Sequence, residues 1–249
     1  IGGSPWNCAK YKCIHGSALK SLLGSIEAWI YRSLKTYRFI DVAICPSYFL
    51  KEKLDTCPQL QSKTVVMHNF VEPIEPTEEV NKDTKPYVLY FGRFSKEKGI
   101  ETMIKVCREL SDIPFVFAGN GPLENEVNET KNIENRGFQT GKALQMLIQN
   151  AKFTVFPSEC NENCPFSVME SLVYGTPVIG ADIGGVPELI KDGKNGYLFR
   201  SGDEDELSEK IKHLWNDEVV LSTMTKECQK VTFDTAFEYC EKLLQYYGT

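Results

Sequence analysis

The sequence predicts an α/β protein, with one domain built on a parallel β-sheet and, before it, the closing part of another α/β domain. After residue 86, short apolar runs alternate with helical segments without interruption, which is typical of a parallel sheet covered by helices on both faces. Residues 71–86 are rich in Glu, Pro, Thr and Lys and lack apolar periodicity, as linkers do. We therefore expect two domains, residues 1–75 and residues 76–249.

The N-terminal part opens on an amphipathic segment. Over residues 17–39, apolar residues recur every three or four positions, which predicts one long helix. Its other face is largely basic, so two interpretations stay open: the helix packs on the sheet of its own domain, or it contacts anionic lipid. A strand over 41–45, a helix over 47–55 capped by Ser47 and a strand over 64–68 are expected next.

The second domain is expected to contain six strands, each a short apolar run bounded by turn residues. They are placed near Tyr87–Phe91, Pro114–Ala118, Ile133–Gly137, Phe153–Phe156, Pro177–Gly180 and Gly196–Phe199. Helices are expected between them, followed by three more over Glu204–Trp215, Val219–Val231 and Thr235–Tyr247. Ligands of such sheets bind at the carboxyl ends of the strands, so the residues directly after each strand are the candidates for a site.

Composition narrows the class of protein. The 249 residues are 42% hydrophobic and carry a net charge of −6. Residues 1–40 carry +5, which leaves −11 for the remainder, so nucleic acid is not expected as a partner. Nine scattered cysteines favour a reducing, cytoplasmic setting, and no apolar run is long enough to span a bilayer. The chain begins without Met, and we expect the opening half of the first domain to lie upstream.

A charged, glycine-bounded loop follows the strand at Tyr87–Phe91. Gly92 and Gly99 permit tight turns, and between them Arg93 and Lys98 can converge on one anion. Two fixed cations would stabilise a leaving group whose negative charge grows as its bond breaks more than they stabilise the bound substrate. The alternative is a solvated basic loop.

Two more glycine motifs end the next strands. Gly119-Asn120-Gly121 allows close approach of a ligand, although a turn leading into a helix explains it equally well. Arg136-Gly137 follows the third strand. Asn69, at the start of the linker, could contribute to a hinge or simply cap a turn.

Two carboxylates straddle a predicted helix start. Glu162 and Glu170 lie on either side of Asn163, a candidate N-cap, and Pro165, expected in the first helical turn. The two acids can lie at most about 17 Å apart, since the helical part rises about 1.5 Å per residue and the extended part about 3.3 Å. That reach suits a nucleotide sugar, with the helix N-terminus facing its diphosphate. Two glutamates at this spacing also arise easily by chance.

These motifs, with their neighbours, resemble a known family. Pro157-Ser158-Glu159, Glu162 through Glu170, Gly175 through Gly180 and Gly184-Gly185-Val186-Pro187-Glu188 occur in the order found in the family-four retaining glycosyltransferases of GT-B architecture. The resemblance runs from about Asp41 to the C-terminus. Asn163-Cys164-Pro165 replaces the more usual Gly-Phe-Gly, a variant that resembles enzymes of bacterial polysaccharide assembly, so the donor sugar stays open.

The resemblance implies a hexose-type UDP- or GDP-sugar donor and a polysaccharide or lipid-linked acceptor. With two cations on the leaving group, no metal ion is expected, and the basic helix over 17–39 would suit contact with the cytoplasmic face of the membrane. It gives catalytic roles to Glu162, which faces the sugar, and to Arg93 and Lys98. Substrate binding falls to Glu170, on the ribose, to the N–H groups of Phe166, Ser167 and Val168 near the phosphates, and to Gly92, Gly119, Asn120, Gly121, Arg136 and Gly137. It also implies a final helix that crosses back to the first domain, and poor transfer by this chain alone.

Other functions remain open on the sequence. A nucleotide-sugar epimerase or a phosphorylase could use the same architecture, and a non-catalytic module could merely hold a nucleotide or a partner protein. Cys8, Cys13 and His15 have a spacing that would suit part of a zinc site if further ligands lay upstream. For the chain as it stands no metal site is predicted.

Overall fold

The computed structural model describes residues 4–72 and 85–248. The chain divides into two compact units, an N-terminal unit (Ile1–His68) and a C-terminal unit (Asn69–Thr249). The predicted boundary between residues 75 and 76, and most of the predicted linker, lie outside the described residues.

In the N-terminal unit, two parallel strands flank a helix. β1 (Ala43–Cys45) pairs with β2 (Thr64–Val66), and α3 (Tyr48–Asp55) connects them. The Ser47 hydroxyl accepts a hydrogen bond from the Leu50 N–H at 3.1 Å, which confirms the predicted cap. Short α1 (Asn7–Tyr11) packs on α2 (Ala18–Ser33).

The prediction of one helix over residues 17–39 is wrong at its C-terminal end. α2 ends at Ser33, Lys35 takes the left-handed conformation (φ 51°), and a separate 3₁₀ turn covers Thr36–Phe39. A left-handed residue breaks the α-helical hydrogen-bond ladder. The apolar spacing could not reveal this break, because Leu34 and Tyr37 are three positions apart in either kind of helix.

The C-terminal unit is built on one six-stranded parallel sheet. Its strands are β3 (Val88–Phe91), β4 (Phe115–Ala118), β5 (Ile133–Asn135), β6 (Phe153–Phe156), β7 (Val178–Ala181) and β8 (Gly196–Phe199). Their order across the sheet is β5-β4-β3-β6-β7-β8, and every pairing is parallel. All six lie where the sequence predicts strands.

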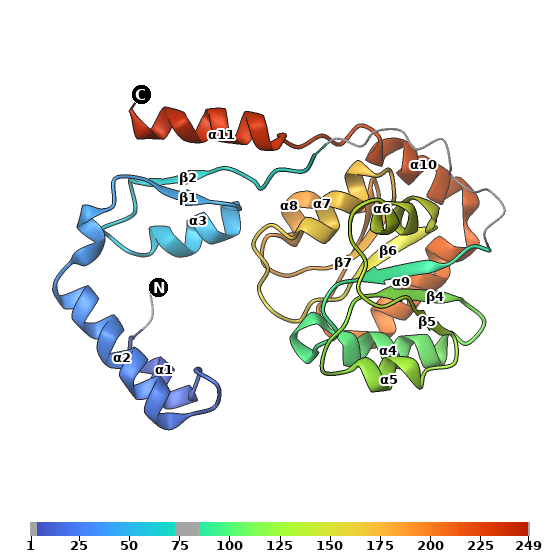
Figure 1. The fold of residues 1–249 in the computed structure, drawn as a ribbon, viewed down its shortest axis with the longest axis horizontal. Coiled ribbons are helices and arrows are strands. Elements are labelled where there is room, and N and C mark those ends of the chain that lie inside the picture. Colours follow the sequence, from blue (N-terminus) through green and yellow to red (C-terminus); the bar gives the residue numbers. More distant parts are fainter. Residues whose placement is uncertain (1–3, 73–84, 249) are drawn as a thin grey trace. The chain divides into compact units, whose positions relative to one another are not determined.

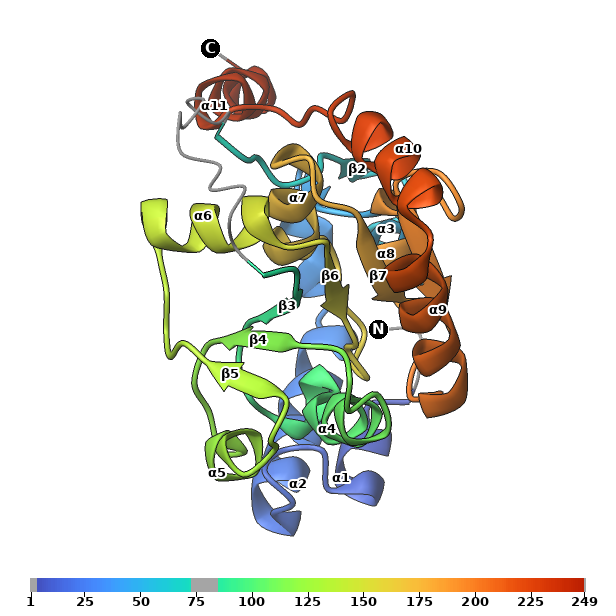
Figure 2. The same cartoon turned by 90° about the vertical axis from the view of Figure 1, so that its right-hand side faces the viewer.

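Helices cover both faces of this sheet (Figures 1 and 2). They are α4 (Ile100–Glu109), α5 (Glu124–Asn128), α6 (Gly141–Asn150), α7 (Phe166–Val173), α8 (Val186–Leu189), α9 (Glu204–Asn216) and α10 (Glu218–Cys228), with α11 (Ala236–Leu244) at the C-terminal end. Within residues 4–72 and 85–248, none of the helices has the length and apolar character needed to cross a bilayer.

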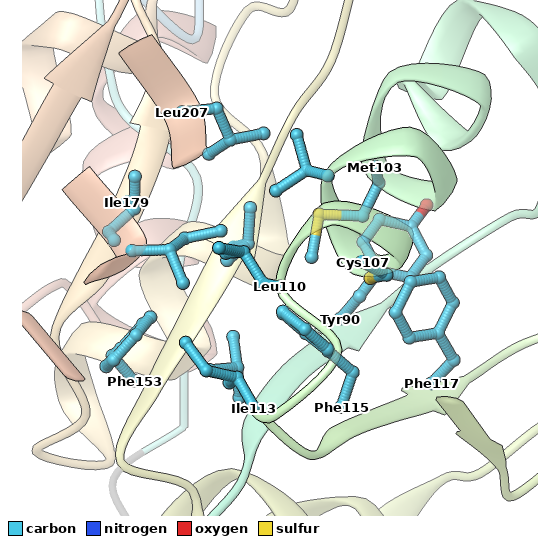
Figure 3. Close-up of a cluster of buried hydrophobic side chains, with 14 of the residues drawn as sticks. Tyr90, Met103, Cys107, Leu110, Ile113, Phe115, Phe117, Phe153, Ile179 and Leu207 are labelled. Atoms are coloured by element: carbon cyan, nitrogen blue, oxygen red, sulfur yellow. The ribbon is translucent and has the colours of Figure 1, made fainter. Parts of the chain in front are cut away.

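The strands bury side chains on both faces, which explains their continuous apolar runs. Along β3, Val88 and Tyr90 point into one core with α4 and α9, whereas Leu89 and Phe91 point into another with α6. Figure 3 shows the first core, in which Met103 and Cys107 of α4 and Leu207 of α9 gather with aromatic side chains of β3, β4 and β6. A third apolar cluster fixes α7 and α8.

Candidate functional site

The strand order itself marks a site. From β3 the chain proceeds to β4 and β5 on one side, then returns to β6 beside β3 and proceeds to β7 and β8 on the other. Ligands of open parallel sheets bind outside the carboxyl ends of the strands at such a switch point. The loops that follow β3 and β6 carry Arg93, Lys98 and Glu162.

The loops after β3 and β6 are packed tightly against each other. A Cβ on Gly99, whose φ is +71°, would lie 1.8 Å from the carbonyl oxygen of Pro157, so glycine is required both for space and for conformation. The N–H of Glu159 donates to the carbonyl of Glu97 at 3.0 Å. This packing fixes Lys98 beside the loop that carries Glu162.

Lys98 and Glu162 form an ion pair, although they lie far apart in the sequence. The Lys98 ammonium donates to Oε1 of Glu162, and the Ser158 hydroxyl donates to the same oxygen at 2.9 Å. The Cys160 thiol lies 3.6 Å from it. The two charged side chains are 32% and 15% exposed, so the pair is partly withdrawn from solvent but reachable.

The backbone of Glu162 is held from the loop after β7. The N–H of Gly185 donates to the carbonyl of Glu162 at 2.7 Å. A Cβ on Gly184, whose φ is +61°, would lie 2.2 Å from that carbonyl oxygen. Three loops therefore meet at Glu162.

The helix after the acidic loop begins later than predicted. Asn163 is not its N-cap and Pro165 is not in its first turn: Pro165 is itself the N-cap, with φ −69° and ψ 124°, and no side chain caps α7. Extended geometry at Pro165 rules out an earlier start. The first intrahelical bond runs from the Met169 N–H to the Pro165 carbonyl at 3.2 Å, so the preceding N–H groups, those of Phe166, Ser167 and Val168, point out of the helix end.

Asn69 contributes to the same helix start. Its side-chain amide donates to the carbonyl of Cys164 at 2.8 Å, so this residue ties the beginning of the C-terminal unit to the acidic loop. Nearby, the N–H of Val71 donates to the carbonyl of Asp234 at 3.0 Å.

Glu170 lies one turn into α7 and is half-buried. Burial raises the pKa of its carboxyl group. Among residues 4–72 and 85–248, no side chain is found in an ion pair or hydrogen bond with this carboxylate. A buried carboxylate of this kind is well placed to accept hydrogen bonds from a ligand.

Arg93 lies in the loop after β3, and the Gly119-Asn120-Gly121 turn packs against this loop. Arg93 is exposed, and its carbonyl accepts a hydrogen bond from the buried Tyr90 hydroxyl at 2.8 Å. A Cβ on Gly119 would lie 1.9 Å from the carbonyl of Gly92, and one on Gly121 would lie 2.4 Å from the carbonyl of Phe94. The glycines of this motif are therefore required for packing, independently of any ligand.

Arg136 and Gly137 follow β5, at the edge of the sheet. The Arg136 guanidinium pairs with Glu134 at 3.0 Å, and the carbonyl of Gly137 accepts a bond from the Gly119 N–H at 2.8 Å. This motif thus borders the Gly119-Asn120-Gly121 turn, and its strand β5 lies three positions from β6, the strand that precedes Glu162.

Three residues of the site, Ser158, Gly185 and Tyr90, were not among the predicted site residues. Ser158 donates to the Glu162 carboxylate, and Gly185 donates to the Glu162 backbone. Tyr90 is buried near Glu162 and Glu97, and this burial and these charges raise the pKa of its hydroxyl. Ser158 and Gly185 do belong to the motifs of the resemblance, and this was the available signal. In the described part of the chain, no three His, Cys, Asp or Glu side chains are gathered so as to hold a metal ion; Cys8, Cys13 and His15 form no such group.

Known proteins share both the fold and the sequence pattern. Residues 72–231 match the family described as glycosyl transferases group 1. An uncharacterised glycosyltransferase of Methanocaldococcus jannaschii is 26% identical over 235 residues, covering 91% of this chain and 64% of that protein. The O-antigen chain mannosyltransferase C of Escherichia coli is 27% identical over 196 residues, covering 71% of this chain and 51% of that protein.

Solved structures agree with the fold. The Anabaena protein HepE, in complex with UDP-glucose, superposes with a TM-score of 0.75 at 17% identity and covers 94% of this chain and 69% of its own. Sucrose-phosphate synthase from Thermosynechococcus elongatus gives 0.75 at 18%, covering 96% of this chain and 64% of its own. These likenesses confirm the predicted α/β fold of GT-B type. The chain spans 64% or less of the two curated relatives named above, and by its match over residues 72–231 it belongs to the glycosyl transferases group 1 family.

Proposed function

We propose that this chain is the donor-binding portion of a retaining, family-four glycosyltransferase that moves a hexose-type sugar from a UDP- or GDP-sugar to a polysaccharide or glycolipid acceptor. One observation carries the proposal: Lys98 and Glu162, from separate loops, meet at the switch point of the sheet beside the uncapped start of α7. A cation and a helix N-terminus suit a diphosphate, and a carboxylate suits the hydroxyls of a sugar.

The diphosphate, the hexose and the ribose of the donor each have a counterpart in this site. The diphosphate faces the N–H groups of Phe166, Ser167 and Val168, with Arg93 and Lys98 as cations. The hexose hydroxyls donate to Glu162, and the ribose hydroxyls donate to Glu170. Because Glu170 is half-buried with no described side chain bonded to its carboxylate, ribose would satisfy an otherwise unpaired acceptor.

The same groups account for transfer without a metal ion. The acceptor oxygen attacks the anomeric carbon from the face that the nucleoside diphosphate leaves, and the departing phosphate takes the proton of the acceptor. Negative charge grows on the diphosphate as the glycosidic bond breaks. Arg93, Lys98 and the end of α7 stabilise this charge more in the transition state than in the ground state.

Relatives support the substrate class. HepE was solved with UDP-glucose, and mannosyltransferase C of E. coli is named for an O-antigen chain. Since the chain spans 64% of the Methanocaldococcus jannaschii relative and 51% of mannosyltransferase C, transfer is proposed for the whole protein. For the 249-residue chain we propose donor binding with little turnover.

Contact with the cytoplasmic face of a membrane is proposed for the N-terminal unit. α2 exposes large apolar side chains, with Leu19 at 68% and Leu23 at 59%, and the segment around it is basic. An anionic lipid surface would suit both features, and it would bring the enzyme to a lipid-linked acceptor.

Calorimetric titration with UDP, GDP, ADP and dTDP tests donor binding. We expect one nucleotide to bind, with affinity lost in Arg93→Ala and Glu170→Ala. Arg200→Ala and Glu241→Ala are matched controls in the same unit, because both residues are exposed and lie outside the site. Binding of no nucleotide, or equal loss in the control variants, would contradict the proposal.

A further inference from the structure

In the described part of the chain, the ion pair and the hydrogen bonds of the Glu162 carboxylate all involve one of its oxygens, Oε1. Lys98 and Ser158 both donate to Oε1, and the Cys160 thiol lies near the same atom. Among residues 4–72 and 85–248, no hydrogen bond reaches Oε2. The carboxylate is therefore anchored at one end, and its other oxygen is left to accept from a ligand.

Ser158 is held in this position by burial and by hydrogen bonds. Its side chain is buried, with 1% of the residue exposed. Its carbonyl accepts a hydrogen bond from the Ser201 hydroxyl at 3.0 Å, and the next residue, Glu159, is bonded to the loop after β3. The hydroxyl also lies 3.4 Å from the carbonyls of Glu97 and Cys160. A hydroxyl has one proton to donate, and the carboxylate is both nearer and charged, so Glu162 receives it.

Lys98 alone would leave the carboxylate free to rotate. An ammonium is a compact point charge on a flexible stem, and it attracts either oxygen equally. The Ser158 hydroxyl, fixed by a buried backbone, distinguishes Oε1 from Oε2. It therefore determines which oxygen is left free for a ligand.

We infer that Ser158 is a positioning residue that orients Glu162 so that Oε2 is presented to a hydroxyl of the donor sugar. This inference rests on the proposed function, in which Glu162 binds that sugar. Ser158 does not itself touch substrate. Its effect is on the sugar part of donor binding and is transmitted only through Glu162.

The test separates the sugar from the nucleotide. Dissociation constants of the full chain are measured for UDP and UDP-glucose and for GDP and GDP-mannose. The ratio of the Kd of the nucleotide to the Kd of its nucleotide sugar reports how much the sugar adds to binding. Ser158→Ala is expected to lower that ratio about tenfold, the usual effect of losing a hydrogen bond to a charged group. It should leave nucleotide affinity unchanged. Ser208→Ala, which removes a buried hydroxyl bonded to the Glu109 carboxylate away from the site, should change neither.

A double-mutant cycle shows whether Ser158 acts through the carboxylate. In Glu162→Gln, the additional change Ser158→Ala should have no further effect on the ratio. If Ser158→Ala lowers the ratio equally in both backgrounds, or lowers nucleotide affinity as much as sugar affinity, the inference is wrong. If wild-type chain binds neither UDP nor GDP, the proposed function fails first.

Discussion

Gly184→Ala tests whether the backbone of Glu162 depends on the loop after β7. Gly184 has a φ of +61°, and a Cβ there would lie 2.2 Å from the carbonyl oxygen and 2.7 Å from the nitrogen of Glu162. Left-handed geometry costs a residue with a side chain about 1–2 kcal/mol. Displacing a packed backbone costs about 1–3 kcal/mol more. We expect a total loss of about 3 kcal/mol in the free energy of unfolding.

Gly193→Ala is the matched control, since Gly193 also has a positive φ (+72°) but a Cβ there meets nothing within 4 Å. It should lose only the conformational part, about 1 kcal/mol. In thermal denaturation followed by circular dichroism, the difference of about 2 kcal/mol corresponds to about 4–8 °C for a unit of this size. Gly184→Ala should also weaken UDP-glucose binding. Equal melting temperatures for the two variants would refute the close contact between Gly184 and Glu162.

Glu170 on α7 and the Lys98–Glu162 ion pair are expected to respond differently to substitution. Because burial raises the pKa of Glu170, the folded protein holds this proton more tightly than the unfolded chain, so the ionised carboxylate opposes folding at neutral pH. Glu170→Gln should therefore melt at a higher temperature than wild type at pH 7, while losing nucleotide affinity. The difference in stability should fade as the pH falls towards 4.5, the ordinary pKa of a glutamate. A difference that does not depend on pH would contradict this reasoning. Lys98→Ala should lower the free energy of unfolding by about 1 kcal/mol, since the ion pair is partly solvated. In calorimetry it should weaken the binding of UDP and of UDP-glucose alike, whereas Glu162→Gln should weaken only the binding of UDP-glucose. The reverse pattern would exchange the roles assigned to the two residues.

Local patterns were sufficient for the secondary structure of the C-terminal unit. A strand buried on both faces is a short apolar run, and this signal is present in each segment independently of the rest of the chain. Helix ends were less well predicted. Pro165 is compatible with both an N-cap and a first-turn position, and only its extended ψ of 124° decides between them.

The sequence by itself determined the α/β class, the six strands, and the loops in which charged residues could form a site. The strand order, which no local pattern contains, was decided by the tertiary structure: β3 and β6 became neighbours only because the chain returns across the sheet after β5. That neighbourhood brings Lys98 to Glu162 and buries Ser158 beneath the carboxylate. Tertiary packing also gave the glycines their role, since Gly99 and Gly184 are required by backbones that lie far away in the sequence. The relative position of two loops is fixed only when the sheet places their strands side by side. For this reason the residues of the site could be named from the sequence, but the contacts between them could not.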